Sequence, residues 1–275
     1  MTLSAPTVSK TPANPPSREE TVLSMVIPTY NERERLSELV RAICQVYRDH
    51  RINGEVVIVD DNSPDGTGAE AERLALEYPV RVIHRSGKLG LGTAVIEGFA
   101  RAQSPIVGVM DGDLSHPPAL LPQMLSVLRD EPVDFVVGSR YVPGGGCRDW
   151  ALVRRLLSRI ACVLARPVTP VRDATSGFFL VRKQAATNVQ LEAGGFKICL
   201  ELLVRGHATS VAEVPYVFVG REVGKSKMNV AEAVGYFKQL ADLCAYRFLG
   251  NGKGKRLTYR RILPGTPSLI PPRTA

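Results

Sequence analysis

The alternation of short apolar runs with charged amphipathic stretches constrains the fold more than any other feature of this sequence. The apolar runs are rich in Val and Ile, are bounded by turn residues and are predicted to be strands. They cover Val22–Pro28, Glu55–Val59, Val80–His84, Ile106–Met110 and Val133–Gly138. Helical segments of about 10–15 residues separate them, which predicts an α/β fold with a mostly parallel central sheet flanked by helices.

Polar residues follow three of these predicted strands. They are Pro28–Glu32, Asp60-Asp61 and Asp111-Gly112-Asp113. In open α/β sheets, ligands bind beyond the carboxyl ends of the strands. We therefore expect the three segments to converge on one crevice.

Asp111 and Asp113 form an Asp-x-Asp pair in an otherwise apolar setting. Two carboxylates this close repel each other unless a cation lies between them, and hard oxygen ligands suit Mg²⁺ or Mn²⁺. Such an ion can stabilise a departing diphosphate. The motif alone more often marks a turn with two solvated aspartates.

The other polar segments suit a nucleotide. Asp60-Asp61 can accept hydrogen bonds from a nucleobase or ribose, and also fits an Asx-type turn. Pro28–Glu32 supplies a bend, an aromatic ring and a carboxylate, although alone it is only a loop before a helix. Gly87–Gly92 opens a helix whose amides favour anions, but it lacks the spacing of a Walker loop or dinucleotide fingerprint.

Charge divides the chain into two halves. Residues 1–140 carry 14 Lys and Arg against 19 Asp and Glu, whereas residues 141–275 carry 21 against 8. This asymmetry suggests two surfaces with different partners, although a solvated basic face also fits. Aromatic residues make up only 6% of the chain and are not interleaved with the basic ones, which argues against nucleic acid as a partner.

The second half is predicted to continue with helices and strands. These are the helix Ala151–Ala165, the strand Gly177–Val181, the helix Phe196–Arg205, the strand Ser210–Val219 and the helix Asn229–Leu249. In the first of these helices, arginines alternate with Leu, Ile and Val, which suits a helix lying at a membrane interface near anionic headgroups. A core-facing helix with solvated arginines is the alternative. We expect the helix over 229–249 to pack on the core.

Three regions follow from composition. Residues 1–21 are rich in Pro, Ser and Thr and are predicted to be a disordered leader, residues 22–249 a single domain, and residues 250–275 a basic, Pro-rich, disordered tail. No stretch approaches the ~18 apolar residues that span a bilayer. Five widely spaced cysteines without a CxxC pair suggest reduced thiols in the cytoplasm.

Several loose motifs occur together and in order. They are Pro28–Glu34, Val59–Thr67 (VDDNSPDGT), Gly90–Ala94 (GLGTA), Met110–Pro117 (MDGDLSHP), Gly138–Tyr141 (GSRY), Asp173–Phe178 (DATSGF) and 224–227 (GKSK). Over residues 22–249 the chain thereby resembles the dolichol-phosphate mannose synthase branch of the family 2 glycosyltransferases. The resemblance implies a GT-A nucleotide-sugar-binding fold, with a donor part at about 22–140 and an acceptor, membrane-facing part at about 141–249.

The resemblance also implies roles for individual residues. The donor would be held by Pro28, Tyr30, Glu32, Val59, Asp60, Asp61, Asp111, Asp113, Arg221 and Lys227. A Mg²⁺ or Mn²⁺ ion would be held by Asp111, Asp113 and Ser115, where some relatives have glutamine at the third position. Arg140, Arg154 and Ser158 would hold the acceptor phosphate, and Asp111, Asp113 and Arg140 would act in catalysis. We interpret His116 as a packed or solvated loop histidine.

The implied reaction moves mannose from GDP-mannose to a polyprenyl (dolichyl-type) monophosphate with inversion. The alternatives are the same reaction with UDP-glucose or another nucleotide-sugar, and a catalytically silent binding protein. The enzyme would lie peripherally on the cytoplasmic face of a membrane. Anchoring would come from surface helices, the basic tail or a membrane-anchoring subunit.

Overall fold

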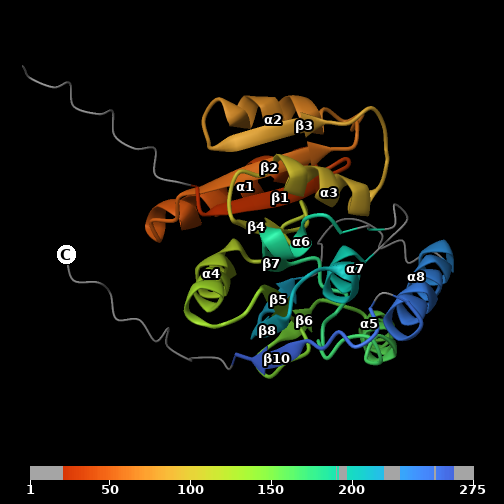
Figure 1. The fold of residues 1–275 in the computed structure, drawn as a ribbon. Coiled ribbons are helices and arrows are strands. Elements are labelled where there is room, and N and C mark those ends of the chain that lie inside the picture. Colours follow the sequence, from red (N-terminus) through yellow and green to blue (C-terminus); the bar gives the residue numbers. More distant parts are fainter. Residues whose placement is uncertain (1–20, 190, 192–196, 220–229, 251, 263–275) are drawn as a thin grey trace, which may run out of the picture.

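An eight-stranded sheet in the order β10-β8-β5-β7-β4-β1-β2-β3 runs through the computed structural model (Figure 1). The structure describes residues 21–189, 191, 197–219, 230–250 and 252–262. Residues 1–20 of the expected leader, the predicted donor residues Arg221 and Lys227, and the tail from residue 263 lie outside these ranges.

Strands and helices alternate through the first half, as predicted. The strands are β1 (Leu23–Thr29), β2 (Gly54–Asp60), β3 (Val80–His84), β4 (Ile106–Val109), β5 (Phe135–Ser139), β6 (Gly146–Arg148), β7 (Phe179–Arg182), β8 (Ser210–Pro215), β9 (Val217–Val219) and β10 (Thr258–Arg261). The helices are α1 (Arg33–Asp49), α2 (Thr67–Ala75), α3 (Leu91–Arg101), α4 (Leu121–Asp130), α5 (Leu152–Leu164), α6 (Lys183–Ala186), α7 (Ile198–Arg205) and α8 (Val230–Phe248), with a 3₁₀ turn η1 (Pro118–Leu120) before α4.

Most strand pairs in this sheet are parallel, and β7 is the exception. Strand β7 runs antiparallel between β4 and β5. Because of this reversal, the loop that leads into β7 lies at the edge where β4 and β5 end. The expected α/β architecture is therefore confirmed, with one antiparallel strand inserted beside the predicted site.

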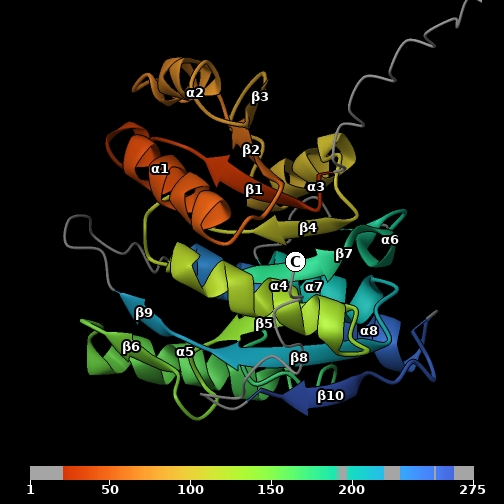
Figure 2. The ribbon, with the colours of Figure 1, turned by 90° about the vertical axis from the view of Figure 1, so that its left-hand side faces the viewer.

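Helices cover both faces of the sheet, and each face has its own hydrophobic core. Met25 and Ile27 of β1 pack with α1, α2 and α4, whereas Val26 packs with α3, α7 and α8 on the other face. Figures 1 and 2 show the two helical layers on opposite sides of the strands. Strands buried on both faces explain why these segments read as continuous apolar runs.

The predicted strand Ser210–Val219 is wrong as a single element, because it divides at Tyr216. Pro215 has no backbone N–H to continue the ladder, and the Tyr216 N–H donates to Ser139 O at 3.0 Å. Beyond this point β9 leaves the main sheet and pairs with β6 in a separate two-stranded sheet. Tyr216 is thereby held near the end of β5.

The prediction that the chain is disordered from Gly250 is wrong for β10. This strand pairs in parallel with β8, Thr258 opposite Ser210, and forms an edge of the sheet. The Tyr259 hydroxyl donates to Glu213 Oε2 at 2.6 Å. Residues 258–261 are flanked by basic and Pro-rich sequence. Composition alone therefore predicted disorder where this strand forms.

None of the helices in the described ranges has the length and apolar composition that a bilayer crossing requires.

Replacing Tyr259 tests whether β10 is docked. Burial and the Glu213 carboxylate raise the pKa of Tyr259 to about 12, so the neutral phenol donates to a charged acceptor. Tyr259→Phe should lower the free energy of unfolding by about 1.5 kcal/mol, since hydrogen bonds to charged groups contribute about 1.5–3 kcal/mol. Urea denaturation would measure the change.

The neighbouring residue provides the control. Arg260 pairs with Glu131 at the surface, so Arg260→Ala should cost less than about 1 kcal/mol. Equal, negligible effects of both substitutions would show that β10 is not part of the folded sheet.

Candidate active site

Three loops meet at the carboxyl edge of the parallel strands, as predicted. Thr29 at the end of β1 lies opposite Asp60 at the end of β2, and β4 pairs with β1 on its other side. A Cβ atom on Gly112 would lie 3.5 Å from Glu32 Cγ and from Thr29 Cγ2. The loop after β1 thus contacts the acidic loop after β4, and the predicted residues of these loops share one edge.

The acidic loop has a strained backbone. Leu114 has a φ of 63°, a left-handed conformation that is costly for a bulky residue. It lies between Asp113 and Ser115, and the Ser115 N–H donates to Asp113 Oδ1 at 3.0 Å. The tight turn points successive side chains of the loop in directions that a regular strand could not provide.

The polar groups of this loop fit a hard divalent cation. The Asp111 side chain is 37% exposed, whereas Asp113 and Ser115 are buried. Among the residues that the structure describes, the buried Ser115 hydroxyl has no hydrogen-bond partner. Carboxylate and hydroxyl oxygens are ligands that Mg²⁺ and Mn²⁺ accept.

These groups do not form a complete metal cage. Within the described ranges, no group of three or more His, Cys, Asp and Glu side chains could hold a metal ion. Mg²⁺ is commonly bound by one or two carboxylates together with the phosphates of a substrate. The Asp111–Asp113 pair fits an ion of that kind, which is shared with a bound diphosphate.

Asp60 and Asp61 are both buried and have internal partners. Asp60 accepts from the Ser63 N–H at 3.0 Å, which is the Asx-type turn that the sequence suggested. Asp61 pairs with the buried Arg85 and accepts from the Gly90 N–H at 2.9 Å. The sequence suggested an external anion at the start of α3. The carboxylate of Asp61 lies there instead.

The remaining predicted nucleoside residues lie in two environments. Tyr30 is at the surface, with Lys88 Nζ 4.0 Å from its ring centroid, and Glu32 precedes α1. Pro28 and Val59 face each other in register inside the sheet, and the Val59 side chain belongs to the core. Contact of these residues with a donor stays a prediction.

Arg140 forms a buried ion pair with Asp173. Its Nε and Nη2 donate to the two carboxylate oxygens at 2.7 and 2.6 Å, and its backbone N–H donates to Oδ2 at 2.8 Å. Burial acts to lower the pKa of Arg140, but the Asp173 charge raises it well above its usual value. The sequence predicted that Arg140 binds the acceptor phosphate. It assigned no role to Asp173, although Asp173 belongs to the DATSGF motif.

Glu213 holds Asp173 in place from the adjacent strand. Its fully buried carboxylate accepts from the backbone N–H groups of Arg172 and Asp173 at 2.8 and 2.9 Å. Sequence reasoning missed Glu213 because a single acidic residue in an apolar strand has no distinctive pattern. The signal that could have identified Glu213 is its position as the one charged residue of the apolar run SVAEVP, because a buried charge needs partners.

An aromatic cluster joins the predicted acceptor arginines to the acidic loop. It consists of Trp150, Tyr216 and Phe218. The Arg154 guanidinium lies 4.1 Å from the Trp150 ring centroid and that of Arg140 lies 5.3 Å from it. The structure thus brings these two predicted residues together, and Ser158 lies one turn of α5 beyond Arg154, near Tyr141.

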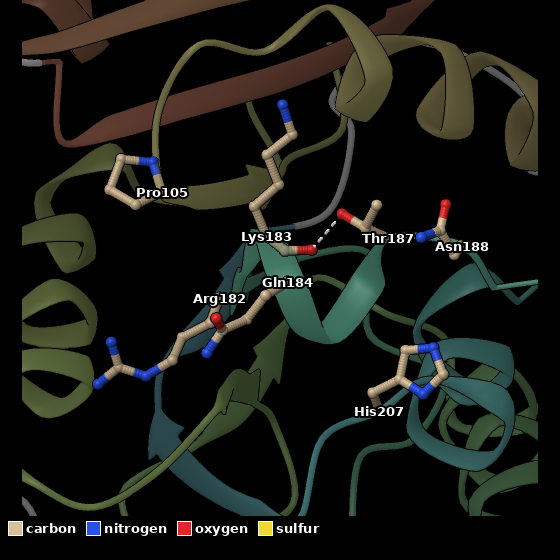
Figure 3. Close-up of a pocket in the computed structure, with 7 residues that line it drawn as sticks. All are labelled: Pro105, Arg182, Lys183, Gln184, Thr187, Asn188 and His207. Carbon is tan, nitrogen blue, oxygen red and sulfur yellow. Dashed lines mark hydrogen bonds between the residues drawn. The ribbon is translucent and has the colours of Figure 1, made fainter.

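A cavity of about 550 Å³ lies at the other end of the strands, where β4 begins and the antiparallel β7 ends (Figure 3). It is lined by polar and basic residues, including Arg182 and Lys183. Figure 3 shows these two side chains pointing in different directions, and they donate to the backbone carbonyls of Leu128 and Ala102. The cavity is therefore separate from the acidic loop, and the side chains of Arg182 and Lys183 do not converge on a common point.

A mostly parallel sheet with carboxylates beyond its strand ends is an α/β architecture in which ligands bind at this edge, and the fold is GT-A. The chain belongs to glycosyl transferase family 2, whose model matches residues 24–198.

Three relatives bear the name dolichol-phosphate mannosyltransferase. The protein from Pyrococcus furiosus is 40% identical over 222 residues, which cover 79% of this chain and 62% of that protein. Those from Mycosarcoma maydis and Saccharomyces cerevisiae are 38% and 36% identical. The aligned regions cover 82% and 87% of this chain, and 80% and 93% of the relatives.

Solved structures share the fold at lower identity. Glucosyl-3-phosphoglycerate synthase from Mycobacterium tuberculosis, in complex with Mn²⁺, UDP and glucosyl-3-phosphoglycerate, has a TM-score of 0.61 at 20% identity. The match covers 82% of this chain and 80% of that one.

Asp173 should be a major determinant of stability. Asp173→Asn would leave the Arg140 guanidinium buried without its counter-charge, and breaking a buried pair in this way costs about 3–5 kcal/mol. Asp242→Asn is the control, because Asp242 pairs with Arg205 but is 41% exposed, and its loss should cost less than about 1 kcal/mol. Comparable urea midpoints for the two variants would contradict the assignment.

Proposed function

We propose that this protein is an inverting hexosyltransferase that transfers mannose from GDP-mannose to the phosphate of a polyprenyl monophosphate. The relatives named dolichol-phosphate mannosyltransferase support the reaction class. One structural observation carries the proposal: Arg140 and Arg154 flank Trp150, whose cluster contacts His116 and, through it, Asp111. An acidic, cation-compatible site and a basic site thus adjoin each other.

The donor would occupy the acidic edge. Tyr30, Glu32 and the turn after β2 would hold the nucleoside, and Arg221 and Lys227 would close over the diphosphate. Asp111 and Asp113, with the Ser115 hydroxyl, would hold a Mg²⁺ or Mn²⁺ ion. When bound, that ion would neutralise charge that develops on the departing diphosphate.

The acceptor phosphate would lie beside the arginines of the second half. A phosphate monoester carries about −1.5 to −2 charge at neutral pH, so its oxygen is already a nucleophile and a general base is not required. Arginine holds phosphate by paired hydrogen bonds. Arg154 would provide these bonds with Ser158, whereas Arg140 would lie beside the phosphate in a position fixed by its pairing with Asp173.

In this scheme the two anions lie on opposite sides of the sugar. A phosphate oxygen of the lipid attacks the anomeric carbon from the face opposite the diphosphate. The new carbon–oxygen bond forms as the bond to the diphosphate breaks, and the electron pair leaves with the diphosphate. An α-linked sugar nucleotide would thus give a β-linked lipid phosphate.

A membrane surface suits the exposed face of α5. Leu152 and Leu156 are 80% and 60% exposed, and arginines on the same helix suit anionic headgroups. The expectation that the helix over 229–249 packs on the core is confirmed for one face of α8. Leu240 and Leu243 are buried, but Phe237 is 57% exposed, and Tyr236 joins α8 to Ala161 of α5 by a 2.6 Å hydrogen bond.

We therefore propose peripheral attachment to the cytoplasmic face of a membrane through α5 and α8, with a membrane-anchoring subunit as a further attachment. In this scheme residues 22–140 bind the donor, and residues 141–249 bind the acceptor and the membrane.

A parallel donor assay tests the proposed function. The purified chain, a prenyl phosphate and Mg²⁺ or Mn²⁺ would be incubated with GDP-mannose or UDP-glucose. We expect transfer of mannose only, and a loss of about 100-fold or more in Asp113→Ala, since several kcal/mol of charge stabilisation would be removed.

Asp49→Ala provides the matched control, because this exposed aspartate lies at the far end of α1 and should leave turnover unchanged. Transfer from UDP-glucose alone would reject mannose as the donor sugar. Near-normal turnover of Asp113→Ala would reject the cation site.

Vesicle binding tests the proposed membrane face. The double variant Leu156→Glu and Val163→Glu should reduce binding to phosphatidylcholine–phosphatidylglycerol vesicles by about 100-fold, because burying each apolar side chain contributes about 1.5 kcal/mol or more. Leu76→Glu is the control, since Leu76 is 87% exposed after α2. Unchanged co-sedimentation of the double variant would exclude this face.

A further inference from the structure

His116 occupies a more specific position than a packed loop histidine. Its Nε2 lies 3.1 Å from Asp111 Oδ2, and its Nδ1 lies 2.9 Å from the Tyr216 hydroxyl. The side chain is 2% exposed. Both ring nitrogens are therefore engaged, one with a carboxylate of the candidate cation site and the other with a residue 100 positions further along the chain.

The contacts define a consistent set of hydrogen bonds around the histidine ring. Burial raises the pKa of Tyr216 well above its ordinary value, so the phenol keeps its proton and can donate it to Nδ1. With the phenol donating to Nδ1, a proton on Nε2 donates to Asp111 Oδ2. This arrangement gives each group in the Tyr216–His116–Asp111 series a complementary partner.

Packing prevents the ring from turning. Its centroid lies 5.3, 5.6 and 5.4 Å from those of Phe178, Tyr216 and Phe218. Tyr216 is held in turn by backbone hydrogen bonds to Ser139 and Gly146, both at 3.0 Å. The His116 ring, which contacts Asp111, is thus held in place by residues of the second half of the domain.

Asp111 is confined on a second side by Gly177. A Cβ atom at Gly177 would lie 2.8 and 2.9 Å from the two oxygens of the Asp111 carboxylate, so a larger residue there would displace it. The side chain nevertheless remains partly exposed. The carboxylate is therefore accessible but limited to a narrow range of orientations.

We propose that His116 and Tyr216 are positioning residues that orient the Asp111 carboxylate for a divalent cation. The proposal rests on the cation site of the proposed function. Partners of metal ligands in this outer position fix ligand orientation, and their loss typically weakens metal affinity by about 10–100-fold. Residues of the acceptor half would then set the geometry of the donor half.

Metal affinity provides the direct test. Binding of Mn²⁺ to the full chain would be measured from the electron paramagnetic resonance signal of free Mn²⁺, at saturating GDP and without acceptor. His116→Leu removes both hydrogen bonds but still places a side chain among the surrounding aromatic rings. It should weaken Mn²⁺ binding by about 10–100-fold. Tyr216→Phe, which removes one hydroxyl, should weaken it by about 10-fold.

Two variants separate orientation from folding. His116→Gln retains an N–H donor on a side chain of similar reach and should recover much of the affinity lost in His116→Leu. Tyr236→Phe removes another buried phenol hydrogen bond, to Ala161 on α5, and should leave Mn²⁺ affinity unchanged. Equal losses in Tyr236→Phe and Tyr216→Phe would overturn the proposal.

Asp111→Ala separates this proposal from the proposed function. If Asp111→Ala weakens Mn²⁺ binding but His116→Leu and Tyr216→Phe do not, the positioning role is wrong and the cation site stands. If Asp111→Ala itself binds Mn²⁺ normally, the cation site is wrong and the positioning role is rejected with it.

Discussion

The buried pair of Arg140 and Asp173 is the interaction on which the site depends. It ties the residue after β5 to the loop before β7 through three hydrogen bonds, and Glu213 fixes that loop from β8. Gly177, four residues after Asp173, is thereby set against Asp111. A buried pair adds little net stability over an apolar core, but it specifies where the two loops meet.

The two halves of the domain consequently form one site. The first half supplies the carboxylates after β4, and the second supplies the aromatic cluster that contacts His116. The antiparallel insertion of β7 between β4 and β5 places these parts side by side. The acidic first half and the basic second half of the sequence thus contribute to one site and do not form two independent domains.

Sequence patterns predicted the sheet and the acidic edge because both depend on local periodicity. Val26 and Val109 lie on buried strands that read as apolar runs. The patterns failed where long-range contacts decide the structure. Strand β10 has only four residues and forms because β8 offers an edge, and the contact of Tyr216 with His116 spans 100 positions. No local pattern could predict either.

In the proposed reaction, Asp111 and Asp113 share a divalent cation with the diphosphate of the donor. A crystal structure of the protein with GDP and Mn²⁺, with the metal located by its anomalous signal, tests this claim most directly. We expect one Mn²⁺ ion coordinated by oxygens of both carboxylates and of the diphosphate. An ion bound to the diphosphate without either carboxylate would contradict it.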